Sequence, residues 1–248
     1  MTGSDESLVL DCHDLEIERA GATIIRGVSL EVRAGEVTVL LGANGAGKST
    51  LLEGISGLIP CRSGAVTVAG VDVSKSKPRR RSRAGLIHVE QGRTVFDDLT
   101  VEENLCVAAP KSEIGRAFDL FPELAPLRKR RSGLLSGGEQ QMLVIGRAIL
   151  CNPKVLLLDE ISLGLAPVLV QRLLPDVAAL ASLEFGILIV EQFAQLALSV
   201  GQRAYVLAHG NVTFEGDCAD LLKDESLLET AYHDTGRLRS PSVKATCR

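Results

Sequence analysis

The 248-residue chain contains no tryptophan, and only 3% of its residues are aromatic. Its formal net charge is -4, so the chain has no overall positive potential. Proteins that bind nucleic acid usually combine a basic surface with aromatic rings on which bases stack. We therefore expect no nucleic-acid partner.

Long apolar runs are also missing. The longest, at residues 155–158 and 186–190, stop well short of the roughly 20 residues that span a bilayer. The first ten residues, MTGSDESLVL, have neither the basic start nor the apolar core of a secretory signal. No two cysteines are spaced like a zinc or redox motif, so we interpret them as free thiols. These absences predict a cytoplasmic chain.

Two short basic clusters stand out against the acidic total, at residues 75–83 and 128–131. Such clusters can face lipid headgroups, acidic partners or water. We interpret both as solvated faces, because most runs of charge on soluble proteins are of that kind.

Hydrophobic patterning predicts an α/β fold. Runs rich in β-formers at 36–41, 86–90, Val155–Asp159 and Gly186–Val190 alternate with stretches of helical spacing, which favours a parallel sheet flanked by helices. Residues 8–18 and 28–32, joined by a turn at 19–23, and residues 64–73 predict a small antiparallel portion. Helical patterns over 99–150, broken by prolines and a glycine, predict a helical insertion.

The segment GANGAGKST matches G-x-x-x-x-G-K-[ST] and lies between a predicted strand and a predicted helix. Glycines let the backbone N–H groups point at phosphates, beside the positive end of the helix. Lys48 should reach the β- and γ-phosphates of ATP, and Ser49 should bind Mg²⁺. The alternative is a glycine-rich turn without a ligand. The expected phosphate contacts are Gly42, Ala43, Asn44, Gly45, Ala46, Gly47, Lys48, Ser49 and Thr50.

Two adjacent carboxylates end the run VLLLDE. In a parallel sheet, the C-terminal ends of the strands face the ligand crevice, so Asp159 can meet Mg²⁺ directly or through water. Glu160 projects differently and could polarise the water that attacks the γ-phosphate. The alternative is that both acids cap the helix predicted to start near Pro167.

A third string, LSGGEQQM, places a serine and two glycines where a helix begins. They offer a hydroxyl, backbone N–H groups and a positive dipole end to a second anion, although a capped turn would look similar. The string is the signature of ATP-binding cassette proteins, and the chain resembles that family. The resemblance implies that the signature contacts an ATP bound by the opposite subunit, through Leu135, Ser136, Gly137, Gly138 and Glu139.

Within the family, residues 10–232 are similar to the smaller ATPase subunit of branched-chain amino acid uptake systems. The strings GRTVFDDLTVEENL, LSGGEQQMLVIGRAIL, SLGLAP and VEQ carry this resemblance. It implies that Gln91 contacts Mg²⁺, the attacking water and the membrane partner. It also places Gln192 near the γ-phosphate, where most cassettes have a histidine. A glutamine keeps hydrogen bonding but cannot become cationic.

Several positions depart from the family pattern. Arg19 stands where an aromatic ring commonly stacks on adenine, and a guanidinium plane can also stack. Ile161 stands where a proline usually follows the glutamate, and Ala166 replaces an aspartate of the loop at 162–167 that crosses the dimer interface.

The resemblance implies one cassette domain at 1–234 and a flexible tail at 235–248. The domain comprises a P-loop NTPase core, an N-terminal antiparallel β-subdomain and a helical signature subdomain. We expect the β-portion at 8–35 and 60–75, the core at 36–59, 86–92 and 153–215, and the helical subdomain at 93–152.

The implied function is ATP hydrolysis that drives import, with ATP and Mg²⁺ bound. The implied partners are a second, different cassette, two membrane permeases and an extracytoplasmic binding protein, with the chain peripheral on the inner face of the cell membrane. An importer of urea or amides and a soluble cassette acting on nucleic acid are the alternatives. A P-loop kinase or GTPase lacks the signature, and the guanine-reading N-K-x-D is missing.

Overall fold

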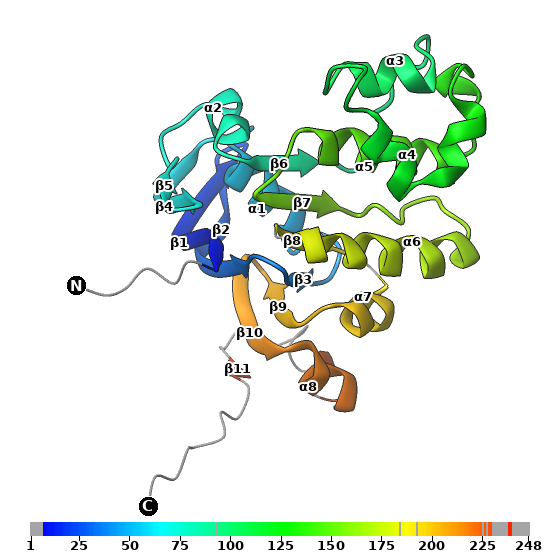
Figure 1. Cartoon of the computed structure of the whole chain (residues 1–248). Coiled ribbons are helices and arrows are strands. Elements are labelled where there is room, and N and C mark those ends of the chain that lie inside the picture. Colours follow the sequence, from blue (N-terminus) through cyan, green and yellow to red (C-terminus); the bar gives the residue numbers. More distant parts are fainter. Residues whose placement is uncertain are drawn as a thin grey trace, which may run out of the picture.

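The computed structural model describes residues 7–92, 94–183, 185–191, 193–224, 226, 228–229 and 238–239. A seven-stranded sheet runs through the middle of the molecule, with a four-stranded sheet at one side (Figure 1). The order of the larger sheet is β11-β10-β9-β3-β8-β7-β6. Its strands are β3 (Val37–Leu41), β6 (Leu86–Val89), β7 (Val155–Asp159), β8 (Gly186–Val190), β9 (Arg203–Ala208), β10 (Asn211–Asp217) and β11 (Leu238–Arg239).

Strands β6, β7, β8, β3 and β9 are all parallel, whereas β10 is antiparallel to β9. The predicted parallel sheet with flanking helices is therefore confirmed. Strand β11, which pairs in parallel with β10, lies within the predicted tail at 235–248. The other residues of that tail are outside the described part of the chain.

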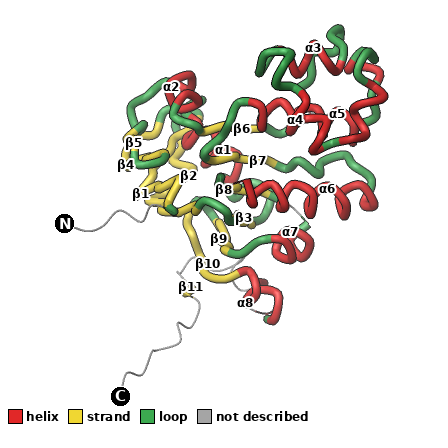
Figure 2. Tube along the Cα trace, in the orientation of Figure 1, coloured by secondary structure: helices red, strands yellow, loops and turns green. Residues whose placement is uncertain are grey.

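Helices cover both faces of this sheet and also form a separate group at one end. Figure 2 draws the part of the molecule around α3, α4 and α5 as helices and loops only, which agrees with the predicted helical insertion. The helices are α1 (Lys48–Ser56), α2 (Pro78–Arg83), α3 (Val101–Cys106), α4 (Gly115–Leu120), η1 (Pro122–Leu127), η2 (Ser132–Leu134), α5 (Gly137–Leu150), α6 (Pro167–Ala179), η3 (Leu180–Leu183), α7 (Ala194–Val200) and α8 (Cys218–Lys223). Among the described residues, none of these helices is long and apolar enough to span a bilayer.

The antiparallel sheet has the order β2-β1-β4-β5, with strands β1 (Leu8–Arg19), β2 (Ala22–Arg33), β4 (Cys61–Val68) and β5 (Val71–Asp72). The predicted strand at 28–32 and turn at 19–23 are wrong in extent. The turn is only Ala20 and Gly21, both at positive φ, as in a two-residue hairpin of type I′. Such a turn keeps pairing up to its flanks, so β2 begins six residues earlier than predicted.

Alternate residues of the central strands face two different cores. Leu156 and Leu158 of β7 pack in the larger core with the insertion and with α6. Val155 and Leu157 pack in the second core, with α1 and the antiparallel sheet. Because both faces of these strands are covered, their sequences are continuous apolar runs. The polar ends of those runs then mark the edge of the sheet where a ligand can bind.

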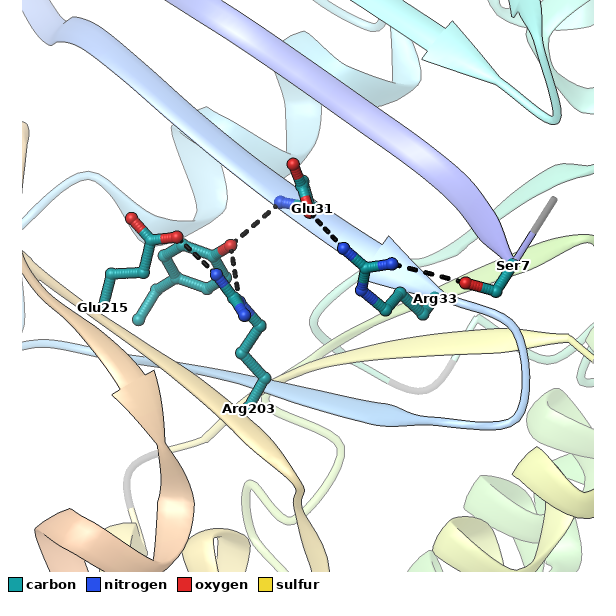
Figure 3. A network of polar contacts seen from close by, with 6 residues as sticks. Ser7, Glu31, Arg33, Arg203 and Glu215 are labelled. Atoms are coloured by element: carbon teal, nitrogen blue, oxygen red, sulfur yellow. Dashed lines mark hydrogen bonds and ion pairs between the residues drawn. The ribbon is translucent and has the colours of Figure 1, made fainter. Parts of the chain in front are cut away.

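A polar network joins the two sheets (Figure 3). The buried hydroxyl of Tyr205 accepts a hydrogen bond from the Glu31 amide at 3.1 Å and one from Arg203 Nε at 3.0 Å. Arg203 also pairs with Glu215 at 2.5 Å, and Arg33 Nη2 lies 2.9 Å from Glu31 Oε2. The bond from Glu31 to Tyr205 fixes β2 against β9, and the other contacts orient the side chains on either side of it.

The basic cluster at 75–83 is not wholly solvated as predicted, because Arg81 is buried beneath the others. Its Nη1 donates to Gly54 O at 2.8 Å and Ile55 O at 2.6 Å, which are carbonyls near the end of α1. Its other nitrogens donate to the carbonyls of Ser74 and Ser76. A cation at a helix C-terminus is favoured by the helix dipole, so Arg81 holds α2 against α1.

Replacing Arg81 with leucine should lower the free energy of unfolding by about 3 kcal/mol, because four carbonyls lose a charged donor at a buried site. Urea unfolding measures this change. The matched control is Arg80→Ala on the same helix, where the side chain is exposed and the expected change is within about 0.5 kcal/mol. Equal effects of the two substitutions would contradict the assigned cap.

His88 on β6 is a half-buried base that should make the free energy of unfolding depend on pH. The Ser56 hydroxyl donates to Glu53 O at 3.1 Å, so it accepts from His88 Nδ1, also at 3.1 Å. Nε2 therefore carries no proton, and it is buried with no hydrogen-bond partner among the described residues. Burial lowers the pKa of His88 to about 4.

The unfolded chain binds this proton near pH 6.5, so the folded state loses stability as pH falls from about 6.5 to about 4, by at most about 3 kcal/mol. His88→Gln removes the titration. The difference in unfolding free energy between the wild type and this variant, measured from pH 7 to pH 4, should narrow or change sign as pH falls. A difference that stays constant would show that His88 does not titrate in this range.

Candidate functional site

The segment between β3 and α1 forms a tight loop in which two glycines, Gly42 and Gly47, have no room for a side chain. A Cβ on Gly42 would lie 2.3 Å from Leu207 O, and one on Gly47, at φ 107°, would lie 2.8 Å from Ile25 Cδ1. The turn between β9 and β10 backs the loop, because the Gly210 amide donates to Ala46 O at 3.1 Å. The sequence thus folds into a loop of fixed shape that leads directly into the start of α1.

Lys48, the first residue of α1, lies inside this loop. Its Nζ donates to Gly42 O at 2.8 Å and to Ala43 O at 3.2 Å, and it lies 4.0 Å from Glu160 Oε1. Burial lowers the pKa of Lys48, while Glu160 and Asp159 act in the opposite direction. The ammonium is therefore aligned at the loop, where a phosphate anion would favour its charged form.

Asp159 ends β7 beside Ser49, whose hydroxyl donates to the carboxylate. The Oδ1 atom of Asp159 is buried without a hydrogen-bond partner among the described residues. Burial raises the pKa of this carboxyl, and the Ser49 bond partly offsets that effect. No group of three His, Cys, Asp or Glu side chains in the described chain could hold a metal by itself. Mg²⁺ in nucleotide sites takes only one or two protein oxygens besides phosphate and water, so Ser49 and Asp159 fit it.

Glu160 follows directly at φ 46°, a left-handed conformation uncommon for a residue with a side chain. Its amide donates to Val190 O at 2.9 Å, and its Oε2 accepts from Gln91 Nε2 at 2.8 Å. The helix α6 does begin at Pro167, but its N-cap is Ala166 and no side chain caps it. The alternative in which the two acids cap that helix is therefore wrong.

Several predicted residues meet in one cavity of about 440 Å³. Arg19 lies at its edge, where its Nη1 pairs with Glu53 Oε2 at 2.7 Å. Glu53 and Ile24 belong to no motif, so no sequence pattern predicts them at this site. The cavity is lined by Arg19, Ile24, Asn44, Gly45, Gly47, Lys48, Ser49, Thr50, Gln91 and Glu160.

The signature residues lie elsewhere, at the start of α5. Ser136 is the N-cap: its Oγ accepts from the Glu139 amide at 3.4 Å, while the Ser136 amide donates to Glu139 Oε2 at 2.6 Å. Leu135 is buried in the larger core, and none of residues 135–139 lines the cavity around Lys48. The chain therefore does not bring its own signature to its own phosphate loop.

Gln192 and Ile161 are not among the described residues that line this cavity. Gln192 lies outside the described residues. Ile161, at the position of the family's proline, is 2% exposed and packs in the larger core. A hydrophobic side chain thus anchors the turn after Glu160 there.

Known proteins resemble the chain over most of its length. The family model described as ABC transporter matches residues 25–162. The high-affinity branched-chain amino acid transport ATP-binding protein BraG of Pseudomonas aeruginosa is 40% identical over 205 residues, covering 80% of this chain and 88% of that protein. The probable branched-chain amino acid transport ATP-binding protein LivF of Archaeoglobus fulgidus is 39% identical over 210 residues, covering 82% and 89%.

Solved structures agree with this assignment. An ATP-binding cassette of an ABC transporter in its ADP conformation has a TM-score of 0.79 and 28% identity, covering 90% of this chain and 97% of that one. A nucleotide-free ATP-binding cassette from an ABC transporter also has a TM-score of 0.79, with 27% identity and coverage of 90% and 98%. The loop, the acidic strand end and the signature lie on a fold shared with these cassettes, and the chain belongs to the ATP-hydrolysing subunits of the ABC transporter family.

Proposed function

We propose that this chain is the ATP-hydrolysing subunit of an importer for branched-chain amino acids. The observation that supports ATP hydrolysis most directly is the cavity in which Lys48, Ser49, Gln91 and Glu160 converge. The similarity to two branched-chain amino acid transport ATP-binding proteins supports the proposed cargo.

ATP would bind with its phosphates in the loop at 42–50, at the N-terminus of α1. Lys48 would exchange its contacts with the carbonyls of Gly42 and Ala43 for the β- and γ-phosphates. Arg19, held by Glu53, would present its guanidinium plane to the adenine. Mg²⁺, held by Ser49 and Asp159, would neutralise part of the phosphate charge.

Glu160 would orient and polarise the attacking water, because its carboxylate faces the cavity next to Lys48. Gln91 Nε2 would hold that carboxylate in place through its 2.8 Å hydrogen bond and would reach the water itself. Gln192 would donate to the γ-phosphate. Most of the catalysis then comes from positioning and charge stabilisation.

A second cassette would complete the site. The signature of this chain lies outside its own cavity, so it is free to contact an ATP on a partner. We propose a different cassette as that partner, two membrane permeases that move as the cassettes close, and an extracytoplasmic binding protein that selects cargo. The chain would then work on the cytoplasmic face of the membrane.

Uptake by the native host tests this assignment. Cells that lack the chain should lose uptake of labelled leucine, isoleucine and valine, and the wild-type gene should restore it while Glu160→Gln should not. Urea uptake in the same cells is the matched control and should not change. Loss of urea uptake with normal leucine uptake would place the chain in a system for another cargo.

A further inference from the structure

Glu191, a fully buried acid that does not line the cavity, accepts two hydrogen bonds from the loop that follows Glu160. Glu191 directly follows β8 and is 0% exposed. Its Oε1 accepts from the Ser162 amide at 3.1 Å, and its Oε2 accepts from the Ser162 hydroxyl. Both oxygens of one carboxylate thus hold one residue, 29 positions away in the chain.

This contact adds to others that fix the same loop to the end of β8. The Glu160 amide donates to Val190 O at 2.9 Å, one residue before Glu191. Inside the loop, the Leu163 amide donates to Glu160 O at 3.0 Å, and the Leu165 amide donates to Ser162 O at 3.0 Å. The end of β8 therefore holds the loop at two places, Glu160 and Ser162, and only the hold on Ser162 uses a side chain of β8's end.

Burying a carboxylate is unfavourable unless it does something that an apolar side chain cannot do. The neighbours of Glu191 in β8 are all apolar and buried, so an apolar residue would be the cheaper choice for packing alone. A carboxylate, in contrast, can accept two hydrogen bonds in fixed directions. Here these two hydrogen bonds fix the path of the backbone after Glu160. Glu160 itself is in a left-handed conformation, which is unfavourable and persists only when neighbouring contacts hold it.

We propose that Glu191 is a positioning residue for hydrolysis. By holding Ser162, it keeps the Glu160 carboxylate at Gln91 and in the cavity. This inference rests on the proposed role of Glu160. It assigns to Glu191 no contact with ATP, so nucleotide affinity should not depend on it.

The side-chain chemistry predicts which substitutions the site tolerates. Glu191→Gln keeps an oxygen for the Ser162 amide, and the Ser162 hydroxyl can turn to accept from the new side-chain NH₂. Glu191→Met has similar length but accepts neither bond. Misplacing a catalytic group by about 1 Å costs about 100-fold, so Glu191→Met should lower kcat about 10- to 100-fold, whereas Glu191→Gln should stay within about threefold.

The experiment measures kcat, KM and the Kd of a fluorescent ATP analogue for full-length wild type, Glu191→Met, Glu191→Gln and Ser162→Ala. The expected result is a loss in kcat with an unchanged Kd, and a combined Ser162→Ala/Glu191→Met variant no slower than Glu191→Met alone. Normal kcat in Glu191→Met, or a Kd that weakens as much as kcat falls, would overturn the proposal.

Hydrogen exchange separates this proposal from the role of Glu160. The Ser162 amide should exchange faster in Glu191→Met than in Glu191→Gln, whatever Glu160 does. Suppose that Glu160→Gln hydrolyses ATP at the wild-type rate while the Ser162 amide exchanges faster in Glu191→Met. Glu160 is then not the catalytic residue, and Glu191 fixes the loop without serving hydrolysis. An unchanged exchange rate of the Ser162 amide in Glu191→Met would show that Glu191 does not fix Ser162.

Discussion

Lys48→Ala should weaken ATP binding by at least about 100-fold, because two charge-assisted hydrogen bonds to phosphate, each worth about 1.5–3 kcal/mol, are lost. In the described part of the chain, Lys48 Nζ donates to the carbonyls of Gly42 and Ala43 and lies 4.0 Å from Glu160, and these contacts tie it to the loop and not to the core. The folded state should therefore keep most of its stability. Isothermal titration calorimetry measures the affinity, and thermal unfolding without ATP measures the stability.

The matched control is Lys77→Ala, an exposed lysine at the N-cap of α2, which should leave the ATP affinity unchanged. Wild-type affinity in Lys48→Ala would exclude Lys48 from the phosphate site. A variant that binds weakly only because it is unfolded would be recognised from its melting curve.

Glu160→Gln should lower ATP hydrolysis by about 10²–10⁴-fold, the usual effect of removing a general base. Binding should persist, because the amide has the same shape and its oxygen can still accept from Gln91. The variant should then accumulate as an ATP-bound assembly of two cassettes, which size-exclusion chromatography with ATP would detect. Steady-state hydrolysis at the wild-type rate would refute the role of Glu160.

Glu113→Gln controls for the loss of one negative charge. Glu113 is exposed in the insertion and belongs to none of the motifs, and its replacement should change neither hydrolysis nor assembly. If it slows hydrolysis as much as Glu160→Gln, the effect of Glu160 is one of net charge and not of position.

The features that sequence reasoning predicted well are those in which one local pattern decides the outcome. Strands β7 and β8 were predicted with correct bounds, because their residues are buried on both faces and form unbroken apolar runs. The rule that the C-terminal ends of parallel strands share one edge placed Glu160 at that edge of the sheet, and the phosphate-loop motif placed Lys48 beside it; Gln91, which lines the same cavity, was expected only from the resemblance to the family.

What sequence reasoning missed depends on partners distant in the chain. Arg81 looks like its exposed neighbours, and only the carbonyls at the end of α1 make it a buried cap. The pairing of Arg19 with Glu53 spans 34 residues, and that of Glu191 with Ser162 spans 29. No local pattern specifies which acid meets which donor over such separations, so these contacts require the structure.

The support behind the phosphate loop has a consequence for synthesis on the ribosome. Leu207 O blocks any side chain at Gly42, and Gly210 donates to Ala46, so the wall of the loop is translated more than 150 residues after the loop itself. A nascent chain that ends before Leu207 has the complete phosphate motif but no wall to shape it. We therefore expect nucleotide capture to be one of the last steps of biogenesis, so that half-made chains do not sequester ATP.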